Sequence, residues 1–161
     1  MKYNPIHILV LIFLFASLDV VAQADACIFC RIAAGTEDQS KTIVYSDQSV
    51  VAFMSHGPRN SGHVLVIPVT HAKLITELPD STTRHVMSVA RKIALAIQKT
   101  EIKADGFNFQ INSGEAAGQE VFHVHMHVIP RFANELPPSK KIFGVDELEL
   151  VAVKIREALR K

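Results

Sequence analysis

The chain has 161 residues, about the length of one domain and too short for a large multidomain enzyme. Its 17 Lys and Arg against 16 Asp and Glu leave a formal net charge of +1, which excludes the strong positive field of a general nucleic-acid coat or a polybasic membrane tether. Hydrophobic residues make up 48% of the chain, a fraction typical of a folded protein and not of a disordered one.

Residues 1–24 predict a secretory signal peptide. A short basic start precedes an apolar run that is shorter than the roughly 20 residues of a membrane span, and small residues follow at Ala22-x-Ala24. We therefore expect a mature protein that begins near Asp25, is periplasmic or secreted, and has no stable membrane span. The alternatives are an uncleaved leader that anchors the protein in a membrane, and a lipoprotein signal with Cys27 as the acylated residue, which the residues before Cys27 disfavour.

The remaining chain, residues 25–161, predicts one α+β unit. A short helix is expected from Cys27 to Ala33. Runs of β-branched and aromatic residues predict strands at 42–46, 50–54, 63–67, 107–111 and 121–131, and the first two form an antiparallel hairpin. Apolar residues at helical spacing predict a main amphipathic helix from Asp80 or Ser81, either as N-cap, to about Lys99, and a C-terminal helical tail whose apolar face includes Leu148 and Leu159.

Three histidines alternate along the last predicted strand. Because side chains alternate faces, His123, His125 and His127 share one face and the residues between them point into the core. Neighbouring histidines then lie roughly 6–7 Å apart and the outer two roughly 13 Å apart. A straight strand cannot bring all three to one zinc ion with bonds of about 2.0–2.1 Å. The three histidines must therefore have different roles, unless they are simply solvated on an exposed sheet face.

This pattern resembles the histidine triad (HIT) superfamily, and in particular its Hint-related bacterial branch. Four separated motifs occur in the order of that family: residues 27–32, residues 62–68 followed by His71, the loop 112–119, and residues 123–131. The resemblance implies an α+β fold with an antiparallel five-stranded sheet, a main amphipathic helix and short N-terminal and C-terminal helices. It also implies a nucleotide-binding hydrolase or nucleotidyl transferase, usually a homodimer joined through helices and a continuous sheet.

The resemblance assigns the chemistry to three histidines. His125 is the expected nucleophile, since a neutral imidazole can form a nucleotidyl-histidine that water later hydrolyses. His127 is expected to bind phosphoryl oxygens and to assist the leaving group or the water, and His63 to orient from the neighbouring strand. The expected substrates are nucleoside phosphoramidates or related nucleotidyl conjugates. The alternatives are dinucleoside polyphosphates, or a non-catalytic module that binds a nucleotide or a partner; no nucleic-acid polymer is expected as a ligand.

The resemblance also implies a set of nucleotide-binding residues. They comprise an apolar slot, a ribose position, and a loop whose N–H groups approach the phosphate: Ile28, Phe29, Phe53, Ser55, Asn112, Gly118, Gln119, Glu120 and Val121. Two of them depart from the family pattern. Ser55 stands where many relatives carry an Asp, and it cannot accept two charge-assisted bonds. Glu120 stands where several relatives carry Ser or Thr, and its carboxylate repels a phosphate unless it points away or acts on a leaving group.

The two cysteines form Cys27-x-x-Cys30, a spacing that suits either a disulfide or redox pair or a zinc site. In some bacterial members of the family two histidines complete a tetrahedral site, and by position these are His71 and His123. We therefore expect a structural Zn²⁺ that braces the catalytic strand, with a disulfide as the alternative. His7 and His85 are given no function.

Overall fold

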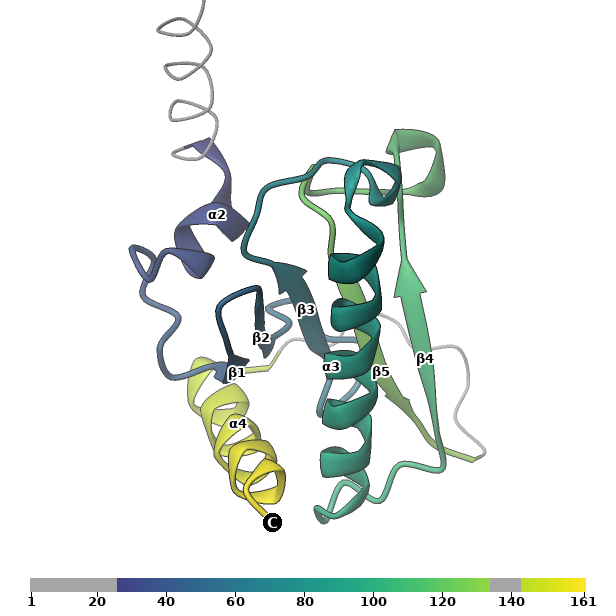
Figure 1. Ribbon diagram of the computed structural model, residues 1–161. Helices are drawn as coiled ribbons and strands as arrows, with labels where there is room; N and C mark the ends of the chain where they lie inside the picture. The colour runs from purple at the N-terminus through teal and green to yellow at the C-terminus, as the bar shows by residue number, and fades with distance from the viewer. Residues whose placement is uncertain (1–25, 134–142) are drawn as a thin grey trace, which may run out of the picture.

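The computed structural model describes residues 26–133 and 143–161. Figure 1 shows a single sheet with two long helices, α3 (Asp80–Gln98) and α4 (Val145–Leu159), and the short helix α2 (Ile28–Ala33). The sheet has five antiparallel strands in the order β1-β2-β3-β5-β4. This architecture confirms the predicted α+β class. The predicted leader, residues 1–24, lies outside the described residues.

The strands are close to their predicted positions. Their bounds are β1 Ile43–Ser46, β2 Val50–Met54, β3 Val64–Pro68, β4 Gly106–Ile111 and β5 Met126–Arg131. The predicted hairpin is confirmed, because β1 pairs with β2 and the intervening Asp47 carboxylate accepts bonds from the N–H groups of Ser49 and Val50 (2.8 and 2.9 Å). β3 ends at Pro68, one residue beyond the predicted range 63–67, and Pro68 pairs with Val50.

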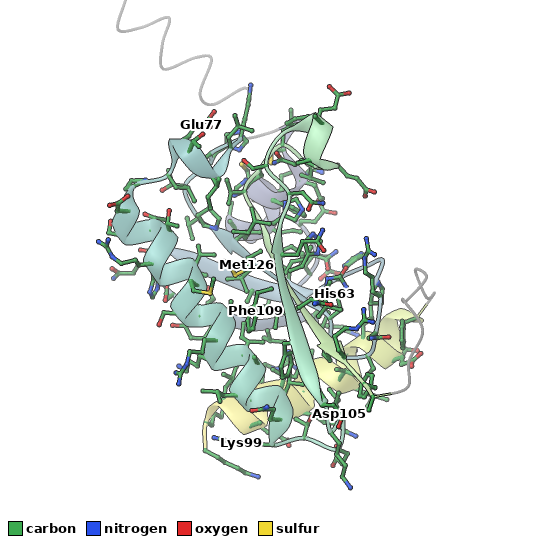
Figure 2. All side chains as sticks on the ribbon, turned by 90° about the vertical axis from the view of Figure 1, so that its right-hand side faces the viewer. His63, Glu77, Lys99, Asp105, Phe109 and Met126 are labelled. Atoms are coloured by element: carbon green, nitrogen blue, oxygen red, sulfur yellow. The ribbon has the colours of Figure 1, made fainter. Side chains whose placement is uncertain are left out.

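Alternation along the central strands gives the sheet two different faces. On β2, Val50, Ala52 and Met54 belong to the main core beneath α3 and α4. Val51 and Phe53 point to the other face and pack with α2 through Phe29 and Ile32. In Figure 2, Met126 lies toward α3 and His63 on the opposite side of the sheet. The second face, with its thinner apolar cover, is the one that can hold a ligand.

The main helix differs from the prediction at its start. Neither Asp80 nor Ser81 is the N-cap; Pro79 takes that position in extended conformation, and no side chain caps the helix. The pyrrolidine ring already fixes φ near the value this position needs, so the chain turns into the helix without a capping side chain. The predicted apolar face is confirmed, since Val86, Val89 and Ile93 are buried in the core.

The last strand is shorter than predicted. It begins at Met126 and not at Val121, so His123 and His125 precede it. The reason is a change of hydrogen-bond partner: the N–H of Val124 donates to the carbonyl of Ala72 (2.8 Å) and that of His123 to Val121 (2.8 Å), instead of to a neighbouring strand. None of the helices in residues 26–133 and 143–161 has the length and apolarity to cross a bilayer.

Candidate functional site

A cavity of about 450 Å³ lies on the face of the sheet opposite α3 and has the size of a small-molecule site. It brings together eleven of the twelve residues predicted to bind or react with a nucleotide. These are Ile28, Phe29, Phe53, Ser55, His63, Asn112, Gly118, Glu120, Val121, His125 and His127. The twelfth, Gln119, is buried elsewhere in the loop, as described below.

His125 has one ring nitrogen committed and one available. Its Nδ1–H donates to the carbonyl oxygen of His123, two residues earlier, at 2.7 Å. In a neutral imidazole only one nitrogen carries a proton, so Nε2 of His125 keeps its lone pair. The ring centroid lies 5.0 Å from that of His127 and both side chains line the cavity. His125 therefore offers a nucleophilic nitrogen to a ligand.

Hydrogen bonds fix which ring nitrogen carries the proton in His63 and in His127. The backbone N–H of Arg59 donates to Nδ1 of His63 (3.1 Å), which forces the proton of neutral His63 onto Nε2. That Nε2–H donates to Nδ1 of His127 (2.9 Å). The proton of neutral His127 consequently resides on Nε2. His127 is thus a proton donor next to the nucleophilic nitrogen of His125.

Burial keeps all three imidazoles uncharged. Desolvation is the main cause of the low pKa values, and it lowers the pKa of His63 to about 3 and that of His127 to about 4. The pKa of His125 is also lowered by burial, although the carbonyl of His123 and the charge of Glu120 act in the opposite direction. Near neutral pH the histidines therefore carry lone pairs and neutral N–H groups, as nucleophilic chemistry requires.

The loop 112–119 holds its shape through Gln119. The side chain of Gln119 is buried; its amide donates to the carbonyls of Lys73 and Val121 (2.8 and 3.0 Å), and its oxygen accepts the N–H of Gly114 (2.7 Å). Gln119 therefore supports the loop with its side chain instead of facing the cavity. Glu120 is exposed and lines the cavity, so it does not point away from a ligand.

Aromatic and aliphatic side chains form one wall of the cavity. Phe29 lies edge-on to Phe53, with ring centroids 5.6 Å apart, and edge-on to His125 at 5.2 Å. Ile28 from α2 lines the same side. The wall thus joins the apolar slot expected for a base to the reactive histidine. Ser55 also lines the cavity, and its own N–H donates to the carbonyl of His63 (2.9 Å).

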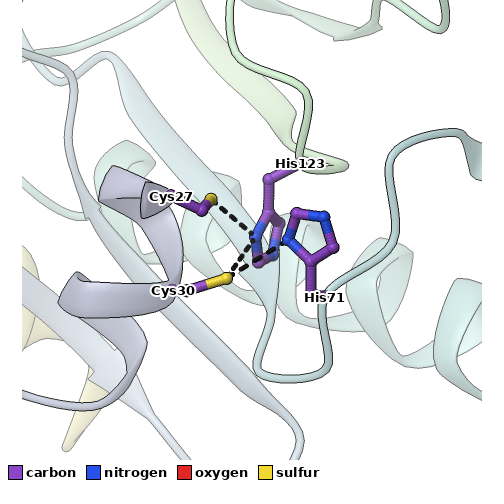
Figure 3. Close-up of side chains that lie close together, drawn as sticks. All are labelled: Cys27, Cys30, His71 and His123. Atoms are coloured by element: carbon purple, nitrogen blue, oxygen red, sulfur yellow. Dashed lines mark hydrogen bonds between the residues drawn. The ribbon is translucent and has the colours of Figure 1, made fainter. Parts of the chain in front are cut away.

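A second cluster lies beside this cavity and contains the four predicted metal ligands (Figure 3). Cys27 and Cys30 come from the start of α2, His71 from the loop after β3, and His123 from the segment before β5. Their candidate ligand atoms all lie within 4.8 Å of one another. Both cysteines are free thiols, so the structure contains no Cys27–Cys30 disulfide.

The donor set fits a tetrahedral cation. Nδ1 of His123 lies 3.5 Å from each sulfur, and Nδ1 of His71 lies 3.2 Å from that of Cys30. Zinc bonds of about 2.0–2.3 Å imply separations of about 3.3–3.8 Å between tetrahedral ligands. The Nε2–H of His123 donates to the carbonyl of Pro68 (2.9 Å), which directs the Nδ1 lone pair at the sulfurs. The four residues can therefore hold a metal ion.

Without a cation, the thiol of Cys30 keeps its proton near neutral pH. Burial, followed by the neighbouring Cys27, raises the pKa of Cys30 to about 12. Burial also lowers the pKa of His123 to about 4, so this ring is neutral and able to ligate. A bound cation would supply the positive charge that a thiolate needs here.

Sequence reasoning missed several residues that line the cavity. Arg59 belongs to the segment 57–62, which the sequence indicates only as a turn. Gln39 and His56 form a hydrogen-bonded pair at the rim, with the His56 Nε2–H donating to Gln39 Oε1 at 2.6 Å. A signal for Arg59 was present, because a residue shortly before His63 in a tight turn must lie near that histidine. No comparable signal marks Gln39. His85, given no function, bonds to Asp47 (2.7 Å) between α3 and the hairpin.

Comparison with known proteins agrees with this geometry. The sequence model of the HIT domain matches residues 36–134. Protein hit of Bacillus subtilis is 44% identical over 109 residues, which are 68% of this chain and 73% of that protein. A Zn-bound histidine triad family protein from Mycobacterium smegmatis superimposes with a TM-score of 0.77 at 33% identity, covering 85% of this chain and 95% of the other. Adenylylsulfatase HINT3 of Arabidopsis thaliana is 37% identical over 65% of this chain and 52% of its own length.

The same comparisons correct the predicted localisation. The homologues that the chain matches, including the Bacillus subtilis and Mycobacterium smegmatis proteins, are typically small HIT proteins, and they do not support export. The prediction of a periplasmic or secreted protein is therefore wrong. The prediction rested on the composition of residues 1–24 alone.

Proposed function

This chain belongs to the histidine triad (HIT) family, and from that premise we propose that it hydrolyses, or transfers the nucleotidyl group of, nucleoside phosphoramidates and related nucleotidyl conjugates. Proteins of this family are in general nucleotide-binding hydrolases or transferases. The observation that carries the proposal is the complementary protonation of two adjacent imidazoles. His125 presents a lone pair to the cavity, and His127 presents a proton.

In the proposed first step, Nε2 of His125 attacks the α-phosphorus of the conjugate. A P–N bond forms to His125 as the bond to the leaving group breaks. The leaving group keeps the electron pair of that bond, accepts a hydrogen bond from Nε2–H of His127 and takes its proton from solvent; this hydrogen bond matters most for a poor leaving group such as an amine. Nδ1 of His125 remains bonded to the carbonyl of His123 (2.7 Å), which stabilises the positive charge that the ring acquires.

In the proposed second step, water replaces His125 on phosphorus. His127 keeps its Nε2–H, which donates to a phosphoryl oxygen, and the proton of the attacking water passes to solvent. The P–N bond to His125 breaks, the nucleoside monophosphate leaves, and His125 returns to its starting protonation. His63 acts as a positioning residue, since its Nε2–H holds Nδ1 of His127 at 2.9 Å and fixes which nitrogen of His127 faces the substrate. If an alcohol or amine replaces the water, the result is nucleotidyl transfer.

The remaining walls of the cavity support a nucleotide as the group transferred. The slot of Ile28, Phe29 and Phe53 offers apolar and aromatic surface for a base. Asn112 lies in the loop and its amide donates to the carbonyl of Gly118 (3.1 Å), which shapes the backbone near the phosphate position. Gly118 has φ of 77°, a left-handed conformation that favours glycine. Ser55 lines the cavity and offers a hydroxyl, in place of a carboxylate, for the proposed ribose contact.

Similarity to Adenylylsulfatase HINT3 supports adenylyl conjugates as one substrate class. Dinucleoside polyphosphates remain the alternative conjugates, and a non-catalytic binding module is the alternative of a different class. The hydrogen bond between His63 and His127, with the ring of His125 5.0 Å from that of His127, favours an enzyme over a binding module.

We also propose that Cys27, Cys30, His71 and His123 hold a structural Zn²⁺. Four protein ligands leave no open position, so the ion would brace the segment before β5 without meeting the substrate. The zinc in the Mycobacterium smegmatis relative supports this choice of metal.

A homodimer is proposed as well. β4 is an edge strand of the sheet, and Phe109 on it is 42% exposed.

We propose that the HIT domain comprises residues 25–161, since α2 and α4 lie outside the matched range but pack on the same sheet.

The proposed reaction is tested with a panel of adenosine and guanosine conjugates, whose products are identified by mass spectrometry. Wild type should release nucleoside monophosphate, and labelled substrate should leave label on His125. His125→Asn should reduce turnover by about 10³-fold or more, because an amide cannot replace the nucleophile, while it still binds nucleoside monophosphate. His85→Asn, on the far face of the sheet, is the matched control and should retain activity. Near-wild-type turnover by His125→Asn would exclude the covalent mechanism.

A further inference from the structure

Arg59 places a guanidinium at the cavity on the His63 side of the histidine row. Its backbone N–H donates to Nδ1 of His63 (3.1 Å), and its side chain lines the cavity with His63 and His127. The positive charge of Arg59 contributes to lowering the pKa of His63 and of His127, whereas it is not among the causes of the pKa shift at His125. The guanidinium therefore acts on the end of the row away from the nucleophile.

Arg59 is also the one cation among the described residues that line the cavity. The imidazoles of His63, His125 and His127 are uncharged near neutral pH, and the carboxylates of the lining belong to Glu37 and Glu120. Glu37 is bonded to Arg31 (3.1 Å), but the guanidinium of Arg59 makes no ion pair or side-chain hydrogen bond within residues 26–133 and 143–161. An anionic ligand that enters the cavity thus meets a single positive charge whose donors are available.

The place of this charge relative to the nucleophile determines which part of the substrate it contacts. In an in-line displacement the leaving group departs from the side of phosphorus opposite the attacking atom. With Nε2 of His125 attacking and Nε2–H of His127 bonded to the leaving group, the leaving group lies on the His127 side of phosphorus. Arg59 lies on the same side, because its backbone N–H bonds to His63 and the ring of His63 is 5.1 Å from that of His127.

We propose that Arg59 is a specificity-determining residue that binds an anionic part of the leaving group, so that the protein prefers nucleotidyl conjugates whose leaving group carries an oxyanion. This inference rests on the proposed function and adds the chemical class of the leaving group. A guanidinium suits the role, because it can donate two parallel hydrogen bonds to a carboxylate, sulfate or phosphate. The carboxylate of Glu120 repels an anion from the loop side and reinforces the preference for the Arg59 side.

The test compares substrates that differ in a single charge. Adenosine 5′-phosphoramidates of glycine and of glycinamide share the same reacting P–N bond, and only the glycine conjugate carries a carboxylate. The ratio of their kcat/KM values in wild type should favour glycine, and Arg59→Gln should lower that ratio by about tenfold or more, the effect of one charge-assisted hydrogen-bond pair. Adenylyl sulfate serves as a second anionic conjugate and distinguishes sulfate from carboxylate as the preferred oxyanion.

Two ratios of kcat/KM are compared, that of the glycine conjugate and that of adenylyl sulfate, each to the glycinamide conjugate. Arg84→Gln, on the exposed surface of α3, is the matched control and should leave both ratios at the wild-type value. Arg59→Lys should give an intermediate ratio, since it keeps the charge but loses the planar pair of donors. A fall in the ratio for either anionic conjugate supports the proposal. An equal loss for charged and neutral conjugates, or no change, overturns it.

A binding measurement separates this inference from the proposed reaction. The dissociation constants of the glycine and glycinamide conjugates are measured for His125→Asn with and without Arg59→Gln, where no turnover is needed. A preference for the glycine conjugate that Arg59→Gln removes supports the role of Arg59 even if wild type hydrolyses neither compound, a result that would refute only the reaction. The same ratio of the two dissociation constants in both proteins would refute the role of Arg59.

Discussion

His123 and His125 lie two residues apart and have opposite chemistry. His123 donates Nε2–H to the carbonyl of Pro68, and its free Nδ1 faces two sulfurs. His125 donates Nδ1–H to the carbonyl of His123, and its free Nε2 faces an open cavity. Both rings are buried and both have lowered pKa values. Burial therefore explains why they are neutral, whereas the backbone carbonyl that each ring contacts explains which nitrogen is available.

The surroundings then separate the two roles. The cluster around His123 contains four possible ligands whose donor atoms all lie within 4.8 Å of one another, which suits a closed structural site. The surroundings of His125 contain a proton donor, a charged arginine and an apolar wall, which suits a reacting ligand. Changes at the two histidines should accordingly affect different properties of the protein.

The largest effect is expected at the metal cluster. Cys30→Ser should lose the bound zinc, about one ion per chain in wild type, and should lower the free energy of unfolding by about 4 kcal/mol or more, because metal binding contributes to folding. A chelator should do the same to wild type. Metal analysis and thermal unfolding measure both changes.

His125→Asn is the control for this experiment, since it should keep its zinc and most of its stability while losing turnover. The alternative disulfide makes the reverse prediction, with sensitivity to a reductant and none to a chelator. Metal-free wild-type protein with both thiols oxidised would contradict the zinc site.

A smaller effect, confined to one class of substrate, is expected at His127. His127→Gln removes the imidazole Nε2–H that bonds to the leaving group, so kcat for a phosphoramidate should fall by about 10²–10⁴-fold. Adenylyl sulfate needs no proton on its leaving group and should lose much less. Steady-state kinetics on both substrates measure the difference, with His85→Gln as the unaffected control. Equal losses on the two substrates would show that His127 does not act on the leaving group.

The sequence predicts which residues gather in the two sites, but not how each of them is oriented. The alternating histidines, the Cys-x-x-Cys pair and the position of His71 predict two groups of residues that the structure brings together. The sequence does not predict that β5 begins at Met126. This start depends on a backbone hydrogen bond from Val124 to Ala72, which is 52 residues away in the chain. Nor does it predict that Gln119 turns inward, since its partner Lys73 lies in another loop. Local patterns thus reveal which residue types gather, while long-range backbone contacts decide how each is oriented.

The smallest effect is expected from pH, and it tests the neutrality that the two histidine environments share. A histidine with an ordinary pKa of about 6.5 would be mostly protonated at pH 5, which would remove the lone pair of the nucleophile. In this protein burial lowers the pKa of His127 to about 4 and that of His63 to about 3, and it also lowers that of His125. Because the neutral forms are the active ones and burial lowers all three pKa values, the fall of kcat/KM with decreasing pH should begin below the range of an ordinary imidazole, and protonation of His127 should deepen it toward pH 4. The profile is measured at constant ionic strength, with zinc content checked at each pH so that loss of the metal is not mistaken for titration of the triad. A tenfold decline between pH 6.5 and 5.5 at full zinc occupancy would mean that the reacting imidazoles are solvated and not desolvated by the cavity.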